Sequence, residues 1–183
     1  KITSEILGIA LTKRSNGAAS SVPLAGFPFH ALDQHLHKLL QAGHRVAICE
    51  QVEDPNKTKG IVKREVVEVI SPGTAMSDKY LSHTKNNYLC SLFFKQRNVG
   101  VSLLDYSTGK FISNEIDLTD LNNFFSYYEI SEILILDSQK ELLSQFSNIS
   151  NLLYTTLPNW LGDSKYANEI LCNHFSVATL KGF

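Results

Sequence analysis

Residues 44–55 read His-Arg-Val-Ala-Ile-Cys-Glu-Gln-Val-Glu-Asp-Pro. The run Val46–Cys49 is short, apolar and β-branched, with charged residues on both sides, which predicts a buried strand rather than a helix. Residues 53–56, Glu-Asp-Pro-Asn, predict a turn, because Asp hydrogen-bonds to its own backbone and Pro fixes φ.

A second strand is predicted downstream, where residues 62–74 read Val-Lys-Arg-Glu-Val-Val-Glu-Val-Ile-Ser-Pro-Gly-Thr. Val62, Val66 and Ile70 are separated by even numbers of residues, so their side chains share one face of the predicted strand. Charged residues interrupt this apolar series, and one edge of the strand is therefore expected to face water. The Ser-Pro-Gly-Thr sequence then ends it with a turn.

A helix is predicted over residues 31–42, directly upstream of these strands. Its leucines, at positions 32, 36, 39 and 40, recur at the spacing of one helical face. Gly43 follows where a left-handed C-terminal cap is favoured. The loop Pro23–His30 leads into the helix, and its aromatic residues Phe27 and Phe29 are expected to pack against the helix entrance.

Five short blocks follow one another along this half of the chain: Leu-Thr-Lys-Arg (11–14), Ala-Gly-Phe-Pro-Phe-His (25–30), Val-Ala-Ile-Cys-Glu-Gln (46–51), Asp-Pro (54–55) and Pro-Gly-Thr (72–74). In this order they closely resemble the N-terminal mismatch-recognition domain of the MutS family of bacterial DNA mismatch repair proteins. Several blocks in the right order are far more specific than any one of them.

The chain changes character over residues 71–86, where polar residues, Pro and Gly replace large apolar ones, so we expect a domain boundary there. Three strands joined by short turns are predicted next, and short turns make sequential strands antiparallel neighbours. These strands are expected at 88–94, 99–106 and 110–116.

Helices and strands alternate in the remainder. A helical stripe near 121–128 precedes Ile133–Leu136, a continuous apolar run that predicts a strand covered on both faces. Ser138–Glu141 is a capping-box sequence that predicts a short helix. A strand at 151–156 follows, and then a helix capped by Asp163, with inward-facing Tyr166, Ile170, Leu171 and Phe175. This order is that of the ribonuclease H fold, and this half resembles the MutS connector domain.

The resemblance implies an α/β fold class, with a small mixed α/β mismatch-recognition domain followed by a ribonuclease H-like connector domain. We expect the first domain in residues 1–76 and the second in residues 77–183. A start at Lys1 without Met suggests a fragment, and the connector is expected to be truncated at its C-terminal end.

The amino-acid composition limits the classes of function that we expect for this chain. The 183 residues carry a formal net charge of −1, which argues against a basic surface over the whole molecule but allows a local basic patch. Three widely separated cysteines in apolar surroundings predict buried thiols in a reducing compartment: Cys49, Cys90 and Cys172. We see no signal peptide and no apolar run approaching the roughly 20 residues of a membrane span, and expect a cytoplasmic protein.

Candidate DNA-contacting residues lie in the first half. Ile6–Leu11 is predicted to be a strand and residues 13–21 a loop that opens with two cations, which suit phosphate contacts. The resemblance favours the phosphate-contacting role over a solvated surface loop, and adds the loop that enters the helix and a second basic pair. The candidates are Lys13, Arg14, Leu24, Ala25, Gly26, Lys63 and Arg64.

Four histidines near the helix raise the possibility of a zinc site. His35 and His37 are two positions apart, so they point about 200° apart around a helix and cannot share one ion. His30 and His44 stand near the helix ends. We therefore expect solvent-facing or helix-terminal histidines and no metal.

An active ribonuclease H-like nuclease is a rival interpretation. Such an enzyme needs carboxylates around two metal ions, one of them from the first strand, and Tyr88–Phe94 contains no acid. Asp105 and Asp137 stand at strand ends, where we expect turn residues rather than catalysts. Fold alone does not establish function, and we predict no catalytic residue.

The resemblance implies a DNA- and protein-binding module. In the family, a Phe-x-Glu motif wedges beside the mispaired base, and this chain contains no such motif, which leaves a paralogue acting on branched or recombining DNA as an alternative. The implied partners are mismatched double-stranded DNA, the MutL protein at the connector, and a second copy of the parent protein. ATP and Mg²⁺ are expected to act in another domain of the parent, and no cofactor is expected here.

Overall fold

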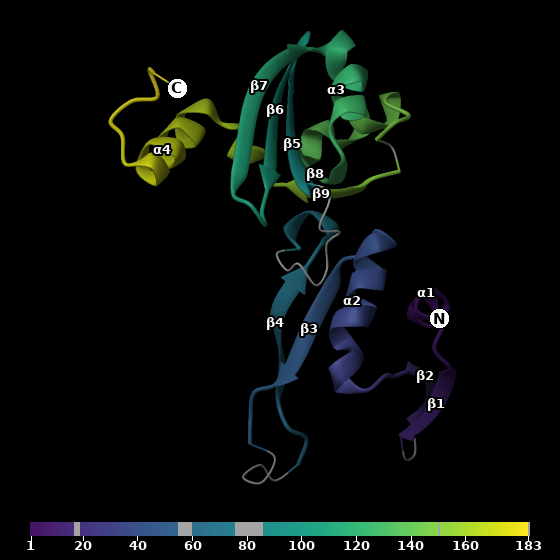
Figure 1. The fold of residues 1–183 in the computed structure, drawn as a ribbon. Coiled ribbons are helices and arrows are strands. Elements are labelled where there is room, and N and C mark those ends of the chain that lie inside the picture. The colour runs from purple at the N-terminus through teal and green to yellow at the C-terminus, as the bar shows by residue number, and fades with distance from the viewer. Residues whose placement is uncertain (17–18, 55–59, 76–85, 150, 183) are drawn as a thin grey trace. The chain divides into compact units, whose positions relative to one another are not determined.

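The computed structural model describes residues 1–16, 19–54, 60–75, 86–149 and 151–182. Contacts divide the chain into two compact units, Lys1–Asn87 and Tyr88–Phe183, and both mix helices with strands, as the predicted α/β class requires (Figure 1). The predicted domain limit at residue 76, and the end of the turn predicted at 53–56, lie outside the described residues. The limit at 76 stays a prediction.

The first unit contains two antiparallel two-stranded sheets, one formed by β1 and β2 and the other by β3 and β4. Its elements are α1 (Ile2–Leu7), β1 (Leu11–Asn16), β2 (Ala19–Ala25), η1 (Phe29–Ala31), α2 (Leu32–Gln41), β3 (Val46–Gln51), β4 (Arg64–Ile70) and η2 (Pro72–Thr74), where η denotes a 3-10 helix.

The core of this unit forms where α2 covers the β3–β4 sheet. Leu36 and Leu40, from the predicted leucine stripe, are buried against Ile70 and Ala75. Gly43 has a φ of 78°, which confirms the left-handed position predicted at the end of the helix.

The start of the chain differs from the prediction. Ile6–Leu11 is not a strand: α1 ends at Leu7, and Gly8 has a φ of 66° with its N–H bonded to the Ser4 carbonyl. Leu7 is buried, and α1 contacts α2. A contact so distant in sequence is not visible in a six-residue pattern, which is why the strand prediction was wrong.

The strands of the second sheet are less buried than predicted. Ala47 and Cys49 of β3 are exposed, and Val66 and Val69 of β4 are more than half exposed. Register pairs Ala47 with Val69 and Cys49 with Val66, so these four side chains share the sheet face opposite α2. The predicted strand at 46–49 is therefore present, but its predicted burial holds only for the face of Val46 and Ile48, because α2 covers one face only.

The second unit is built on one five-stranded sheet in the order β7-β6-β5-β8-β9. β5 pairs antiparallel with β6 and parallel with β8, as the ribonuclease H resemblance predicts. Its elements are β5 (Tyr88–Lys95), β6 (Asn98–Asp105), β7 (Lys110–Asp117), η3 (Leu118–Asp120), α3 (Leu121–Tyr127), β8 (Ile130–Leu136), η4 (Asp137–Gln145), β9 (Leu153–Leu157), η5 (Asn159–Gly162) and α4 (Ser164–Phe175).

One sheet face carries the core of this unit. Cys90, Val101 and Ile133 come from adjacent strands and are buried with Leu121 of α3 and Leu143 of η4. The cysteine prediction is thus confirmed for Cys90, whereas Cys49 is exposed and Cys172 partly buried.

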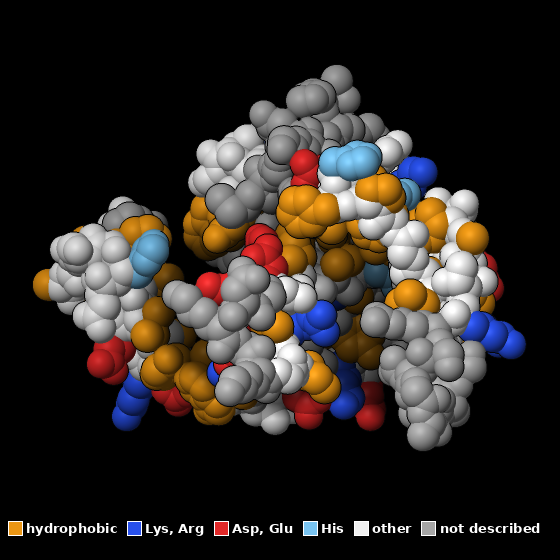
Figure 2. Space-filling model, turned by 90° about the horizontal axis from the view of Figure 1, so that it is seen from below, with side chains coloured by type: hydrophobic (Ala, Val, Ile, Leu, Met, Phe, Trp, Pro, Cys, Tyr) orange, Lys and Arg blue, Asp and Glu red, His pale blue; other side chains and the backbone are white. Residues whose placement is uncertain are grey.

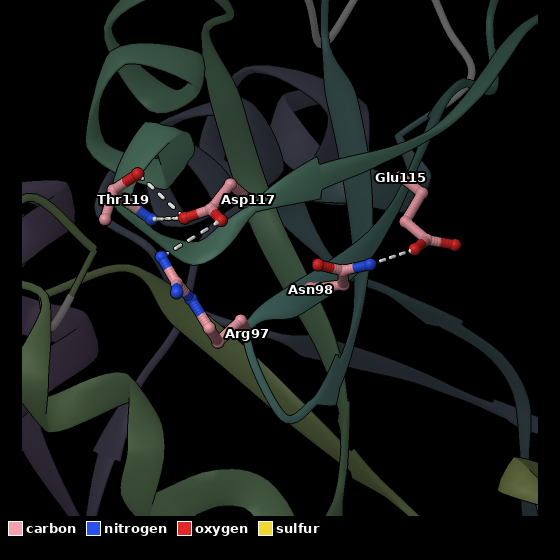
Figure 3. A network of polar contacts seen from close by, with 5 residues as sticks. All are labelled: Arg97, Asn98, Glu115, Asp117 and Thr119. Atoms are coloured by element: carbon pink, nitrogen blue, oxygen red, sulfur yellow. Dashed lines mark hydrogen bonds and ion pairs between the residues drawn. The ribbon is translucent and has the colours of Figure 1, made fainter.

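A cluster of polar side chains stabilises the connection between β7 and α3 (Figure 3). Asp117 accepts hydrogen bonds from the Thr119 N–H at 2.9 Å and hydroxyl at 2.8 Å, and Arg97 Nη2 lies 3.9 Å from the same carboxylate. These Thr119 hydrogen bonds, with the nearby Arg97 charge, lower the pKa of Asp117. Asn98 donates to Glu115 beside this cluster.

The predictions for the end of the chain hold in part. The short helix predicted at Ser138 is present as the 3-10 helix η4, but Ser138–Glu141 forms no capping box, because η4 begins after Leu136. Asp137 pairs with Lys140 at 2.9 Å. Asp163 does cap α4, by accepting from two backbone N–H groups. The four apolar side chains expected to face inward remain 36–47% exposed: Tyr166, Ile170, Leu171 and Phe175.

Candidate nucleic-acid interface

The β1–β2 hairpin brings most of the predicted DNA-contacting residues together. Lys13 lies opposite Pro23 and Arg14 opposite Val22, so residues 13–21, predicted to be a loop, are mainly strand. Leu24 and Ala25 end β2, and Gly26 follows directly. Gly17 and Ala18 lie outside the described residues.

A side-chain hydrogen bond holds this hairpin in register. Thr12 Oγ1 donates to the Leu24 carbonyl at 3.0 Å, across the pair that joins these two residues. Lys13 is therefore carried on a paired strand, which restricts its backbone more than the predicted loop would.

Exposed apolar side chains accompany the Lys13 cation. Leu24 is 47% and Val22 49% exposed, and Leu11 is also exposed. Sequence reasoning identified Leu24 and missed the other two. The Asn16-Gly17 dipeptide is a strong hairpin signal, and it would have placed Leu11 and Val22 on paired strands.

The second basic pair lies on the other sheet. Arg64 begins β4 opposite Gln51 and is exposed. The Lys63 ammonium is paired with the Glu65 carboxylate at 2.5 Å, so a neighbouring negative charge offsets it. Arg64 is consequently the stronger phosphate-contact candidate of the two.

On the face that the space-filling view in Figure 2 presents, Lys and Arg side chains lie among hydrophobic and acidic ones. This mixture agrees with the near-neutral formal charge of the chain. Lys13 and Arg64 are therefore considered as individual cations and not as parts of a uniformly basic surface.

The two phenylalanines before α2 behave differently. Phe27 contacts the helix as predicted, with its ring centroid 4.4 Å from that of His35. His35 Nδ1 is buried without a hydrogen-bond partner among the described residues. Phe29 is 83% exposed, so its predicted packing against the helix entrance was wrong.

The carboxylates considered for a nuclease are engaged in local structure. Asp105 accepts hydrogen bonds from the Ser107 hydroxyl at 2.7 Å and from the Ser107 and Thr108 N–H groups at 3.1 and 3.3 Å. Burial alone would raise the pKa of Asp105, but these hydrogen bonds outweigh burial and lower it. Asp137 pairs with Lys140. Asp105 thus holds the turn after β6, as predicted, whereas Asp137 is the first residue of η4 and not a turn residue.

Within the described ranges, no cluster of three or more His, Cys, Asp or Glu side chains is arranged to hold a metal ion. The described helices include none that is both long and apolar enough to cross a bilayer.

Comparison with known proteins covers both units. The family model of MutS domain I matches residues 1–79, and that of MutS domain II matches residues 87–183. A protein named DNA mismatch repair protein MutS from Chlorobaculum parvum is 43% identical over 184 residues, covering 98% of this chain. The proteins of the same name from Phocaeicola vulgatus and Cytophaga hutchinsonii are 42% and 41% identical, covering 100% and 98% of this chain. The chain spans 21% of the length of each of these relatives.

Proposed function

The chain belongs to the MutS family of DNA mismatch repair proteins, with its two units in domains I and II, and from that premise we propose that the first unit contacts double-stranded DNA. The relatives' shared name favours mismatch repair over a paralogue that acts on branched DNA.

The β1–β2 hairpin is the observation that supports this proposal best. It presents the exposed Lys13 with exposed Val22 and Leu24 on one small two-stranded element. The pairing places Lys13 on one face of this ribbon and Val22 and Leu24 on the other, so one face can offer a cation to a phosphate while the other offers apolar side chains to the sugars or the groove floor. Arg64 on β4 supplies a second cation.

Contacts of this kind are phosphate-directed, so they position the duplex and carry no direct sequence information. Binding by this chain alone is therefore weak and salt-sensitive, since each neutralised phosphate releases counterions.

Fluorescence anisotropy of a labelled duplex, titrated at several salt concentrations, tests the proposal. Replacing Lys13, Arg14 and Arg64 by Ala is expected to weaken binding and to reduce the slope of log K against log salt by about one per lost phosphate contact. Lys110→Ala, an exposed lysine of the second unit, is the matched control. Unchanged binding in the triple variant, or binding indifferent to salt, would refute the assignment.

For the second unit we propose that it serves as an attachment surface for MutL, in a homodimeric cytoplasmic parent protein. ATP and Mg²⁺ would act in a domain other than the two matched here. A pull-down of purified MutL with the chain and with the separate units would test the attachment, and retention by the first unit alone would contradict it.

A further inference from the structure

No described side chain of the β1–β2 hairpin is buried. Ala25 is partly buried, and the other side chains that the structure describes there are exposed: Leu11, Thr12, Lys13, Val22, Pro23 and Leu24. A two-stranded ribbon without a buried face is marginal by itself and has to be held by the segments at its ends. The position of Lys13 therefore depends on how the two ends of the hairpin are held.

The upstream end is held by α1. Leu7, the last residue of α1, is 5% exposed, and α1 contacts α2. Ser4 Oγ donates to the Ile9 carbonyl at 2.6 Å, which ties the chain between α1 and β1 back to this helix. This end of the hairpin is thus connected to α2 by way of a buried leucine.

Ring packing holds the downstream end. Three residues, 26–28, separate β2 from the 3-10 helix η1, and Phe27 is the middle one. Phe27 is partly buried, and its ring centroid lies 4.4 Å from that of His35, at an interplanar angle of 49°. His35 is followed in α2 by Leu36, which is 1% exposed, so the part of the helix that carries the ring contact is fixed in the core.

The His35 imidazole has a cost at this position. Its Nδ1 atom is buried and has no hydrogen-bond partner in the part of the chain that the structure describes. A buried polar atom without a partner lowers stability, and an apolar ring would avoid that loss. The stabilising contribution of His35 is therefore its ring contact with Phe27, and no described hydrogen bond of Nδ1 adds to it.

We propose that His35 is a positioning residue for DNA contact, which holds the β1–β2 hairpin in one orientation on α2 through the Phe27 ring. The proposal rests on the proposed function, in which this hairpin contacts DNA. A hairpin that is already fixed can present Lys13 to a phosphate with little further loss of conformational freedom, which favours association. Without the ring contact, the two strands stay paired and the hairpin moves about its upstream end.

Anisotropy titrations of a labelled duplex with the whole chain test the proposal. His35→Ala is expected to weaken binding and to reduce the slope of log K against log salt by about one, as the loss of one phosphate contact does. In a background that already carries Lys13→Ala and Arg14→Ala, the same change is expected to have no further effect, because the contacts that it weakens are gone. A change that merely destabilises the unit would weaken binding by the same factor in both backgrounds.

Three further variants isolate the ring contact. His35→Phe keeps a ring and removes the unpaired nitrogen, so it is expected to bind DNA as the parent sequence does and to unfold at a higher temperature. Phe27→Ala removes the contact from the other side and is expected to reproduce the binding loss of His35→Ala. Gln34→Ala, at the exposed neighbouring position of α2, is the matched control and is expected to leave binding unchanged.

A spin-label distance measurement follows the hairpin without DNA. Labels are placed at the exposed positions Val22 and Lys38 after the two cysteines that are not buried have been replaced by Ser. The distribution of label distances is expected to broaden in His35→Ala and to stay narrow in His35→Phe. An unchanged distribution in His35→Ala, or an equal loss of binding in both backgrounds, would overturn the proposal. The proposed function would fail differently, because replacing the basic residues themselves would then leave binding unchanged while the label distances still responded to His35→Ala.

Discussion

Gly162 lies so close to Leu136 that a β-carbon built on the glycine would be 2.5 Å from Leu136 Cδ1 and 3.1 Å from Phe93 Cε2. Gly162 ends η5 just before α4, and Leu136 ends β8. The missing side chain lets this turn approach the sheet, on the face opposite the main core of the second unit.

Replacing Gly162 by Ala therefore tests this approach. We expect a loss of about 1–3 kcal/mol in the free energy of unfolding, since overfilling a packed contact forces neighbours to shift. Gly100→Ala in β6 is the control, because its added β-carbon would meet nothing nearer than 3.8 Å. Urea unfolding of both variants is the measurement, and equal stabilities would show that the η5 turn moves freely.

The Asp105 carboxylate predicts a pH dependence of stability. Its lowered pKa means that the native state binds the proton less readily than the unfolded chain. The stabilisation is therefore present above the ordinary Asp pKa and is lost as the pH falls through the native value. Asp105→Ala is expected to cost about 2 kcal/mol at pH 7, by the usual worth of hydrogen bonds to a charged acceptor, and less near pH 3. Urea unfolding at both pH values measures the stability cost of Asp105→Ala. A cost that does not change with pH would contradict the predicted direction of the pH dependence.

Asp105→Asn is the companion variant. Its amide oxygen can still accept from Ser107 and Thr108, so the turn is kept while the charge is removed. Its stability should show less acid dependence than that of the parent sequence.

The three thiols are expected to react in the order Cys49, Cys172, Cys90. Cys49 is exposed, whereas burial raises the pKa of Cys90 to about 12. At pH 8 the thiolate fraction of Cys90 is about one part in ten thousand, and the thiolate is the reactive form. Thiol labelling followed by peptide mass spectrometry gives the order, with Cys49→Ser as the control that removes the fastest phase. Fast labelling of Cys90 in the native protein would place it outside the core.

Sequence patterns predicted the elements whose signals are local or repeated. The leucines of α2, its terminal Gly43 and the Asp163 cap each act within one or two turns of chain. The five strands of the second unit were predictable in order, because short turns and a continuous apolar run leave few arrangements.

Two of the failed predictions concern what covers an element. β3 has the apolar composition of a buried strand, yet only one face meets α2, and nothing in residues 46–51 specifies a second layer. The apolar side chains of α4 have a helical spacing but remain partly exposed. Spacing shows which side chains share a helix face, but it does not show which element packs against that face. For the candidate interface, the basic residues were visible in the sequence, whereas the hairpin that carries Lys13 was missed although the Asn16-Gly17 dipeptide indicates it.

The last prediction concerns mismatch discrimination by this chain. Discrimination requires an apolar wedge at a weakened base step and a partner for the exposed base edge, and this sequence contains no Phe-x-Glu motif to supply both. Phe27 is engaged with His35, whereas Phe29 and Leu24 are exposed, as are Leu11 and Val22 of the hairpin. We expect the affinities for a G·T duplex and its G·C parent to be equal, with a ratio of about one. A competition titration of both duplexes at one salt concentration gives this ratio. A preference of tenfold or more, about 1.4 kcal/mol, that disappears in Phe29→Ala or Leu24→Ala would show that one of these side chains acts as a wedge.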